Sequence, residues 1–388
     1  MTVASAFEPL EDLLQGFAEA TPGYSGQLCV MLHGNVIVDV SVGDLTTDQL
    51  TGVYSCSKGA AAAVIGMLFQ SGDLDLEAPV AKYWPEFAAE GKERLTVQEL
   101  LSHRAGLMGI DGGVPMGEYL DSENLAQRLA ALPRMWKGNT LFAYHALTVG
   151  VFAEELVRRI AGVSLQHLYE QEIRSVHGLD FYLGLPESQE ERFAPVRPPL
   201  DGWPESFVDP FGFQGVGLNS ATGFLDDNGQ QSFDFFTVPN LRIIREKAPA
   251  SVGGVANARG LAGFYATLGK TLNAETLQEI TTLTVAGTDI SSGESGAFAT
   301  LFTKPRPEDN FGSWRAFGHA GFNGARGYSD PLYGLAVGYV PLHAELSGEG
   351  TRSDRIFKLA RQLVLNYAAT GQPELRTNEP SSSTPKDS

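Results

Sequence analysis

A serine and a lysine stand three positions apart at the start of a segment of small residues, "SCSKGAAAAVIG", which contains Ser55 and Lys58. On a helix, such residues share a face, so the lysine amine can reach the serine hydroxyl. In the first turn, free N–H groups and the helix dipole favour an oxyanion. A lysine desolvated among alanines can act as a base near neutral pH. The pair indicates a serine nucleophile with its base, although the same spacing also occurs where the serine is an N-cap and the lysine is solvated.

Two later stretches carry further candidates. "TLFAYHALTVG" places Tyr144 before a predicted helix, and "FGHAGFNGARGYSDP" places His319, Ala320 and Gly321 on a predicted strand. Alone, the tyrosine reads as a buried aromatic and the glycine as a turn residue. Together with "SCSK", the stretches resemble in order and spacing the three active-site motifs of the serine β-lactamase and penicillin-binding protein superfamily. More specifically, residues 8–370 resemble its β-lactamase-like esterase branch, the family VIII carboxylesterases.

This resemblance implies roles for individual residues. Ser55 would be the acylated nucleophile, Lys58 its activating base, and Tyr144 a phenolate or proton relay that also protonates the leaving group. Which of Lys58 and Tyr144 takes the first proton stays open, because coupled groups titrate as a unit. The oxyanion hole would consist of the backbone N–H groups of Ser55 and Phe322.

The chain departs from the motifs of penicillin-recognising members at two places. Those members carry Lys-Thr-Gly or Lys-Ser-Gly on the strand, where the cation and hydroxyl help to hold the antibiotic's carboxylate. Here His319, Ala320 and Gly321 would line the substrate site, and a neutral imidazole and a methyl group are poor substitutes for that grip. The tyrosine motif also has Ala146 where Tyr-x-Asn would place an amide. Both departures favour esters over β-lactams.

The function expected from this resemblance is a serine carboxylesterase that hydrolyses short-chain acyl esters of phenols or small alcohols without a cofactor. One alternative is a β-lactamase or a D-amino-acid peptidase or amidase that uses the same residues. Another, from a different class of protein, is a catalytically silent binding protein that retains the fold.

Other candidate sites are weaker. Cys56 follows the serine directly, but one residue along a helix rotates a side chain by about 100°, so a packing role is predicted. The sequence shows no Gly-x-Ser-x-Gly elbow of an α/β-hydrolase. The histidines lack metal-ligand spacing, so no metal is expected; His103 and His145 are predicted to be structural, and His319 to line the pocket.

Composition limits the partners. The chain has 388 residues, 43% hydrophobic, and a net charge of −18, which disfavours nucleic acid and anionic membrane surfaces. The N-terminus lacks a signal-peptide pattern, and no stretch approaches 18 uninterrupted apolar residues, so a cytoplasmic protein without a membrane partner is expected. Its two cysteines, Cys29 and Cys56, are expected to be reduced, with Cys29 in a strand core. The oligomeric state is undetermined.

The predicted fold is α+β, a β-lactamase/transpeptidase-like antiparallel sheet flanked by helices with an inserted, mainly helical subdomain. The hydrophobic pattern and turn residues predict a hairpin around His33-Gly34-Asn35 and a strand meander after Trp314. Helices are predicted over 7–19 and 55–70, within three later stretches of the middle, and near the C-terminus. The predicted parts are a sheet domain (1–60 and 250–370), a helical subdomain (61–249) with an irregular aromatic-rich segment (181–249), and a disordered tail (371–388).

Overall fold

A six-stranded antiparallel sheet combines strands from both ends of the chain. The computed structural model describes residues 2–370 except 201, 203–207, 222–223, 226–230, 234, 236 and 346–349, so the predicted tail lies outside the described residues. The strand order is β1 (Thr2–Val3), β3 (Asn35–Val42), β2 (Gly26–Leu32), β13 (Leu335–Pro341), β12 (Arg326–Asp330) and β11 (Phe317–Ala320). The predicted hairpin and meander are thereby confirmed.

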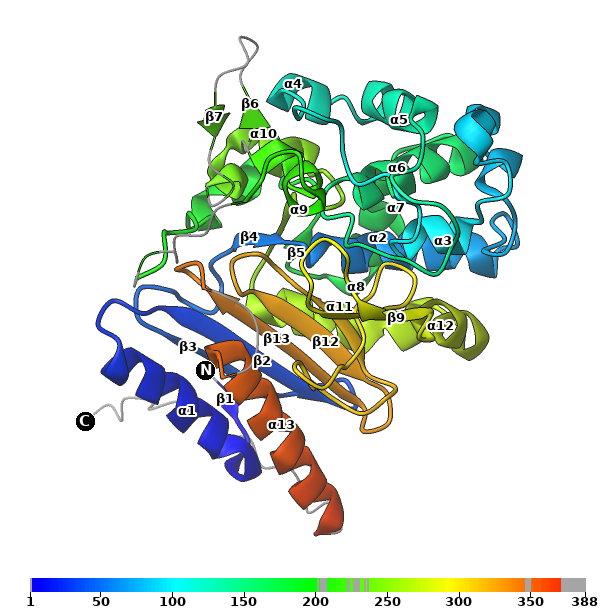
Figure 1. Cartoon of the computed structure of the whole chain (residues 1–388). Coiled ribbons are helices and arrows are strands. Elements are labelled where there is room, and N and C mark those ends of the chain that lie inside the picture. The colour runs from blue at the N-terminus through cyan, green and yellow to red at the C-terminus, as the bar shows by residue number, and fades with distance from the viewer. Residues whose placement is uncertain are drawn as a thin grey trace, which may run out of the picture.

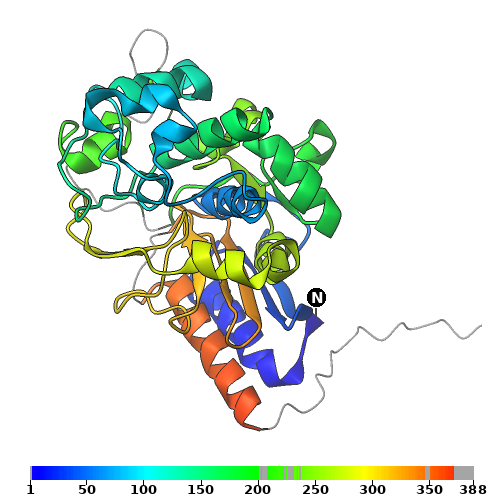
Figure 2. The same cartoon turned by 90° about the vertical axis from the view of Figure 1, so that its right-hand side faces the viewer.

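Two helices cover one face of this sheet. Helix α1 (Glu8–Ala20) and helix α13 (Arg352–Ala369) lie side by side there, and both views show them on the side away from the helical part of the molecule (Figures 1 and 2). Proline at the first turn favours the start of α1, and Thr351 caps α13 by accepting the Asp354 N–H. Because the sheet is covered on both faces, β2 is buried along nearly its whole length instead of alternating.

Helix α11 (Ala258–Thr271) covers the other face and approaches it very closely. Gly338 of β13 pairs with Gly327 of β12 and with Cys29 of β2, so three small residues lie in a row beneath the helix. A Cβ atom at Gly338 would lie 2.2 Å from the Ala258 carbonyl oxygen, and one at Gly327 would lie 2.5 Å from the Tyr265 ring. These small residues let the helix backbone contact the sheet directly.

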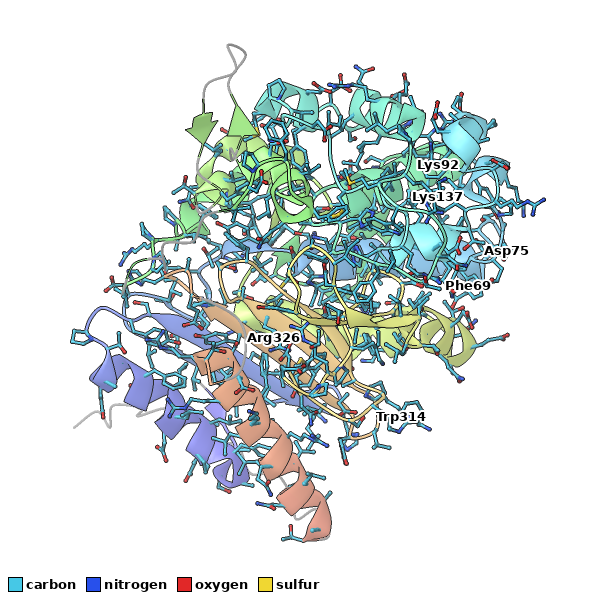
Figure 3. The ribbon with its side chains drawn as sticks, viewed as in Figure 1. Phe69, Asp75, Lys92, Lys137, Trp314 and Arg326 are labelled. Carbon is cyan, nitrogen blue, oxygen red and sulfur yellow. The ribbon has the colours of Figure 1, made fainter. Side chains whose placement is uncertain are left out.

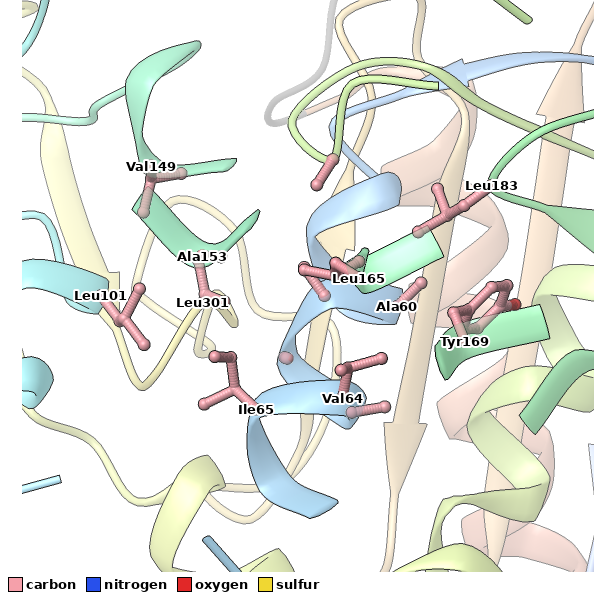
Figure 4. Packing of buried hydrophobic residues seen from close by; sticks show 14 of the residues in the cluster. Ala60, Val64, Ile65, Leu101, Val149, Ala153, Leu165, Tyr169, Leu183 and Leu301 are labelled. Carbon is pink, nitrogen blue, oxygen red and sulfur yellow. The ribbon is translucent and has the colours of Figure 1, made fainter. Parts of the chain in front are cut away.

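Helix α2 (Ser57–Gln70) is the central helix of the main core. It is apolar on all sides, as expected of a helix surrounded by protein. Figure 4 shows Ala60, Val64 and Ile65 of α2 among side chains from α6 (Thr148–Ala161), α7 (Leu165–Tyr169) and neighbouring segments. A second sheet leads into α2; its strands are β4 (Thr51–Tyr54), β8 (Gly254–Ala256) and β5 (Phe181–Tyr182), in that order.

The remaining elements are short. The helices are α3 (Val97–Leu101), α4 (Met116–Tyr119), α5 (Ser122–Ala131), α8 (Ser175–His177), α9 (Phe213–Gly217), α10 (Arg242–Lys247) and α12 (Ala274–Thr281). Two hairpins consist of β6 (Phe224–Leu225) with β7 (Gln231–Phe233), and of β9 (Val285–Thr288) with β10 (Ser295–Phe298).

Two buried cations have structural partners. In the helical part, Lys92 donates to the carbonyl oxygens of Ala89 and Leu132 at 2.6 and 2.5 Å. On the sheet, Arg326 lies 2.6 Å from the Asp309 carboxylate (Figure 3 labels both cations). Each therefore holds a loop in place, as buried charges with hydrogen-bond partners do.

The elements that the sequence predicts are present, with shifted boundaries at some of them. The first helix covers 8–20 instead of 7–19, and Gly72 adopts the predicted left-handed conformation after α2, with φ of +81°. Helix α2 begins at Ser57, not at 55. The Lys58 N–H donates to the Ser55 carbonyl oxygen three residues back, so a tighter 3₁₀-type turn precedes the α-helix. The division of the chain into two domains stays a prediction.

Replacement of Gly338 by alanine tests the close contact between α11 and the sheet. Because the new methyl group would overlap the α11 backbone, we expect Gly338→Ala to lower the free energy of unfolding by about 1–3 kcal/mol in chemical denaturation. The matched control is Gly269→Ala, at an exposed position of the same helix with no atom within 4 Å of the new Cβ, which should stabilise by about 0.5–1 kcal/mol. Equal effects of the two changes would contradict the packing argument.

Candidate active site

The candidate nucleophile lies in the turn that joins β4 to α2. Tyr54 ends the strand with left-handed backbone angles, and Ser55 follows it, two residues before the first residue of the helix. The Ser57 hydroxyl donates to the Tyr54 carbonyl oxygen at 2.5 Å and accepts the Gly254 N–H at 2.8 Å. Ser57 therefore fixes this strained turn against β8, which explains how a tyrosine is held at a positive φ.

Lys58 lies beside Ser55, as the three-residue spacing predicts. Its Nζ is 3.0 Å from the Ser55 Oγ, 2.8 Å from the Ala146 carbonyl oxygen and 3.0 Å from the Ser251 carbonyl oxygen. The side chain is completely buried, and this desolvation lowers the pKa of its amine to about 7. In the neutral amine, the two carbonyl groups accept the two N–H groups. The lone pair is then left for the Ser55 hydroxyl, as general-base chemistry requires.

Ser251 fixes the carbonyl groups that hold the lysine. Its hydroxyl donates to the Leu147 carbonyl oxygen at 2.7 Å and accepts the Gly150 N–H at 2.9 Å, both at the start of α6. A Cβ atom at Gly150 would lie 2.5 Å from both the nitrogen and the Oγ of Ser251, so glycine permits this contact. The loop that carries Ser251 and the segment that carries Ala146 are thereby joined around Lys58.

Tyr144 completes the cluster. The Lys58 Nζ lies 5.0 Å from the centroid of its ring, and its hydroxyl is 3.5 Å from the His319 Nε2. The ring stacks on Phe298 with centroids 5.8 Å apart and planes 9° apart. Burial raises the pKa of the phenol, and a hydrogen bond with the Ser55 side chain acts in the opposite direction. The tyrosine is therefore a neutral phenol at neutral pH.

The strand motif brings a neutral imidazole to this cluster. The His319 Nδ1–H donates to the Ala320 carbonyl oxygen at 2.9 Å, which leaves Nε2 unprotonated on the side of Tyr144. Burial is the largest cause that lowers the pKa of His319, to about 3. At Gly321, a Cβ atom would lie 2.5 Å from the Val53 carbonyl oxygen, so glycine allows this end of β11 to approach the strand that leads to the serine.

The turn after β11 places Phe322 near the nucleophile's turn. Asn323 anchors it, because the side-chain amide donates to the Gly52 carbonyl oxygen at 3.0 Å. The Phe322 ring lies 6.0 Å from that of Tyr54 and is 42% exposed. The Ser55 amide has no hydrogen-bond acceptor within the described ranges. An oxyanion hole made by the amides of Ser55 and Phe322 stays a prediction.

Cys56 points away from the lysine. Its thiol donates to the carbonyl oxygens of His319 and Ala325 at 3.4 and 3.6 Å and is completely buried. Burial raises the pKa of this thiol to about 12. The predicted packing role is confirmed, and Cys29 is buried in β2 as predicted. Both cysteines are free thiols.

His103 and His145 form a buried layer behind Tyr144. The backbone N–H of His145 donates to the His103 Nδ1 at 3.1 Å, and the ring centroids of His103 and Tyr144 lie 4.9 Å apart. His145 Nδ1–H donates to the Ala143 carbonyl oxygen at 2.6 Å, and its Nε2 accepts the Leu107 N–H at 3.1 Å. Burial lowers the pKa of both rings, in His145 to about 4. These neutral rings have the structural role predicted for them.

The aromatic-rich segment is only partly described. Phe211 and Phe213 are exposed, and Phe213 contacts Trp136 with ring centroids 6.2 Å apart. Phe235 packs against the main core. The remaining aromatic residues of the prediction, Trp203, Phe207, Phe236 and the side chain of Phe233, lie outside the described residues.

Sequence patterns do not identify three residues whose side chains hydrogen-bond to backbone groups of the site segments. Ser251 and Asp289 carry no motif, and Asn323 stands before Gly324 in a pair that signals only a turn. Asp289 accepts the Tyr144 backbone N–H from a distance of 145 residues in the chain. Such contacts depend on tertiary packing, which spacing along the chain does not reveal.

The residues that the structure describes lack two further features. They contain no group of three or more histidine, cysteine, aspartate or glutamate residues that could hold a metal ion. None of their helices combines the length and the apolar character that a membrane crossing requires.

Comparison with known proteins identifies the family. The sequence model of the Beta-lactamase family matches residues 10–357. The esterase/beta-lactamase LipL of Mycobacterium tuberculosis is 29% identical over 356 residues, which cover 84% of this chain and 80% of LipL.

Solved structures agree with this match. The structure of EstA from Arthrobacter nitroguajacolicus Rue61a has a TM-score of 0.88 and 44% identity, covering 94% of this chain and 98% of EstA. A family VIII carboxylesterase has a TM-score of 0.81 and 27% identity, covering 93% of this chain and 98% of its own. These matches confirm the predicted fold. Because the family model spans most of the sequence, the chain belongs to the β-lactamase family.

Proposed function

We propose that this protein is a serine carboxylesterase that hydrolyses short-chain acyl esters of phenols or small alcohols. The observation that carries the proposal is the lone-pair geometry of Lys58, whose amine has a pKa of about 7 and lies 3.0 Å from the Ser55 Oγ. The names of LipL, EstA and the family VIII carboxylesterase support esters as the substrate class. Ser55 as a residue is only 8% exposed, which favours small acyl groups.

In the acylation step, the Ser55 Oγ attacks the ester carbonyl carbon while its proton moves to the Lys58 Nζ. The developing oxyanion accepts hydrogen bonds from the backbone N–H groups of Ser55 and Phe322. When the bond to the alcohol breaks, the Tyr144 hydroxyl donates a proton to the leaving oxygen and regains one from the Lys58 ammonium. The products are the acyl-enzyme, neutral Lys58 and the free alcohol.

In the deacylation step, water attacks the acyl carbon and gives its proton to Lys58. The tetrahedral intermediate then collapses and the Ser55 oxygen leaves the acyl carbon. The Lys58 ammonium returns the proton to the Ser55 oxygen. The carboxylic acid is released, so each cycle consumes one water molecule and restores the enzyme.

His319 supports esters over β-lactams. Its ring has a pKa of about 3 and is therefore neutral at neutral pH. It occupies the strand position from which a lysine would hold a carboxylate, and a neutral ring gives no ionic contact to a β-lactam's carboxylate. Simple esters have no such carboxylate and lose nothing by this replacement.

Substrate choice and nucleophile can be tested together. We expect a higher kcat/KM for nitrophenyl acetate than for nitrocefin, and an acetyl adduct on Ser55 in intact-protein mass spectrometry with peptide mapping. Ser55→Ala should remove both turnover and adduct, because the nucleophile is lost, whereas Cys56→Ala should keep both. A higher kcat/KM for nitrocefin would establish the amide-directed alternative, and normal turnover by Ser55→Ala would sink the mechanism.

The pH dependence reports the base. Deprotonated Lys58 is the active form, so kcat/KM should rise with pH through about 7 and then reach a plateau. His319 and Cys56 titrate near 3 and 12 and do not contribute in this range. Lys58→Arg, which stays protonated, should lose about 100-fold or more in kcat/KM. Lys304 is another buried lysine, and burial lowers its pKa to about 8, so Lys304→Met is the control and should keep the profile. If Lys58→Arg left the profile unchanged, Lys58 would be excluded as the base.

Tyr144 should matter most for poor leaving groups. In Tyr144→Phe the ring remains but the proton donor is lost, so kcat for ethyl acetate should fall about 100-fold or more. Hydrolysis of nitrophenyl acetate should change much less, because nitrophenolate leaves without a proton. Steady-state kinetics on the two acetates measures the difference. Equal losses on both substrates would argue against proton donation to the leaving group.

A further inference from the structure

The hairpin formed by β9 and β10 presents one buried carboxylate to the tyrosine segment. Residues 286–288 of the hairpin are exposed, whereas Asp289, directly after them, is only 5% exposed. Its Oδ2 accepts the backbone N–H of Tyr144 at 2.8 Å. Its Oδ1 accepts the N–H and the hydroxyl of Ser291, at 2.8 and 2.6 Å. One oxygen thus shapes the hairpin turn, and the other reaches the candidate active site.

A buried carboxylate is costly unless hydrogen bonds replace its hydration. Within the described part of the chain, Asp289 takes part in no ion pair. Instead, its oxygens accept hydrogen bonds from the backbone N–H groups of Tyr144 and Ser291 and from the Ser291 hydroxyl. A hydrogen bond from a backbone amide to a charged acceptor is strong and directional, so it fixes the position of the tyrosine backbone.

The same hairpin contacts the tyrosine segment at other points. The Ile290 N–H donates to the Phe142 carbonyl oxygen at 3.2 Å. The Phe142 ring packs against Phe298 of β10, and a Cβ atom at Gly296 would lie 2.6 Å from that ring. Phe298 in turn stacks on Tyr144. The hairpin and its turn therefore hold residues 142–144 in place through hydrogen bonds to their backbone and through ring contacts.

We propose that Asp289 is a positioning residue for the catalytic tyrosine. By holding the Tyr144 amide, it places the phenol hydroxyl beside Ser55 and His319, where the leaving oxygen of the ester is protonated. This inference rests on the proposed function and adds to it the residue that sets the tyrosine's place. Burial is the largest cause that raises the pKa of the phenol, and the Asp289 charge acts in the same direction, so the hydroxyl keeps the proton it must donate.

Asp289→Ala tests this role on two esters that share an acyl group. With ethyl acetate, kcat should fall about 10- to 100-fold while KM changes little, because a small displacement of a catalytic group costs that much in rate. With nitrophenyl acetate, kcat should stay within about threefold of the wild type, because its leaving group needs no proton. The retained activity shows in the same preparation that the protein is folded and that Ser55 and Lys58 function.

Two further variants separate positioning from local stability. Ser291→Ala removes a hydroxyl from the same carboxylate but leaves the bond to Tyr144, so it should resemble the wild type on both esters. Asp289→Asn keeps one acceptor oxygen and removes the charge, so its loss on ethyl acetate should be smaller than that of Asp289→Ala. If Asp289→Ala does not fold, Asp289→Asn replaces it in the test. The ratio of its kcat for ethyl acetate to its kcat for nitrophenyl acetate then decides whether Asp289 positions Tyr144.

Equal losses of kcat on both esters, or no loss on either, would overturn the role of Asp289. Tyr144→Phe measured in parallel identifies the cause. If that variant shows the leaving-group effect and the Asp289 variants do not, the positioning role fails and the proposed function stands. If Tyr144→Phe shows no such effect, the tyrosine is not the proton donor, and both the inference and that step of the proposed function fail.

Discussion

The site depends on the burial of one amine. Lys58 is completely enclosed, and desolvation lowers its pKa from 10.5 to about 7. Between these pH values the unfolded chain binds a proton that the folded chain releases, so folding is less favourable near pH 7 and becomes more favourable as pH rises towards 10.5. In the proposed mechanism, this loss of stability provides a base that is ready near neutral pH, a trade common at active sites. The carbonyl groups of Ala146 and Ser251 limit this cost by accepting hydrogen bonds.

The surrounding architecture keeps this amine dry and brings distant segments to it. Helix α2 is apolar on all sides and lies in the middle of the main core, so its first turn is shielded from water. The glycine row of β12 and β13 draws the sheet against α11, and Gly321 lets β11 approach the strand before the serine. Small residues at these points therefore set how closely the sheet approaches α11 and how closely β11 approaches the strand before Ser55.

Tyr144 and His319 are both neutral in this site. A strand lysine would place a second cation near the phenol and favour the phenolate, whereas a neutral imidazole does not. Burial and the charge of Asp289 both raise the pKa of Tyr144, so the phenol stays protonated. In the proposed mechanism, base and acid are therefore divided between two groups, Lys58 and Tyr144, whose pKa values the same burial moves in opposite directions.

Local sequence determined the elements and the central pair. The three-residue spacing brings Ser55 and Lys58 together, and apolar runs separated by turn residues define the hairpin and the meander, because these features depend on neighbours in the chain. The start of α2 at Ser57 and the lowered pKa of Lys58 arise only in the folded molecule. Ser251, Asn323 and Asp289 hold groups that are about 100 or more residues away along the chain. Their roles follow from hydrogen bonds across packed elements, and only the tertiary structure decides which distant amide or carbonyl group each side chain meets.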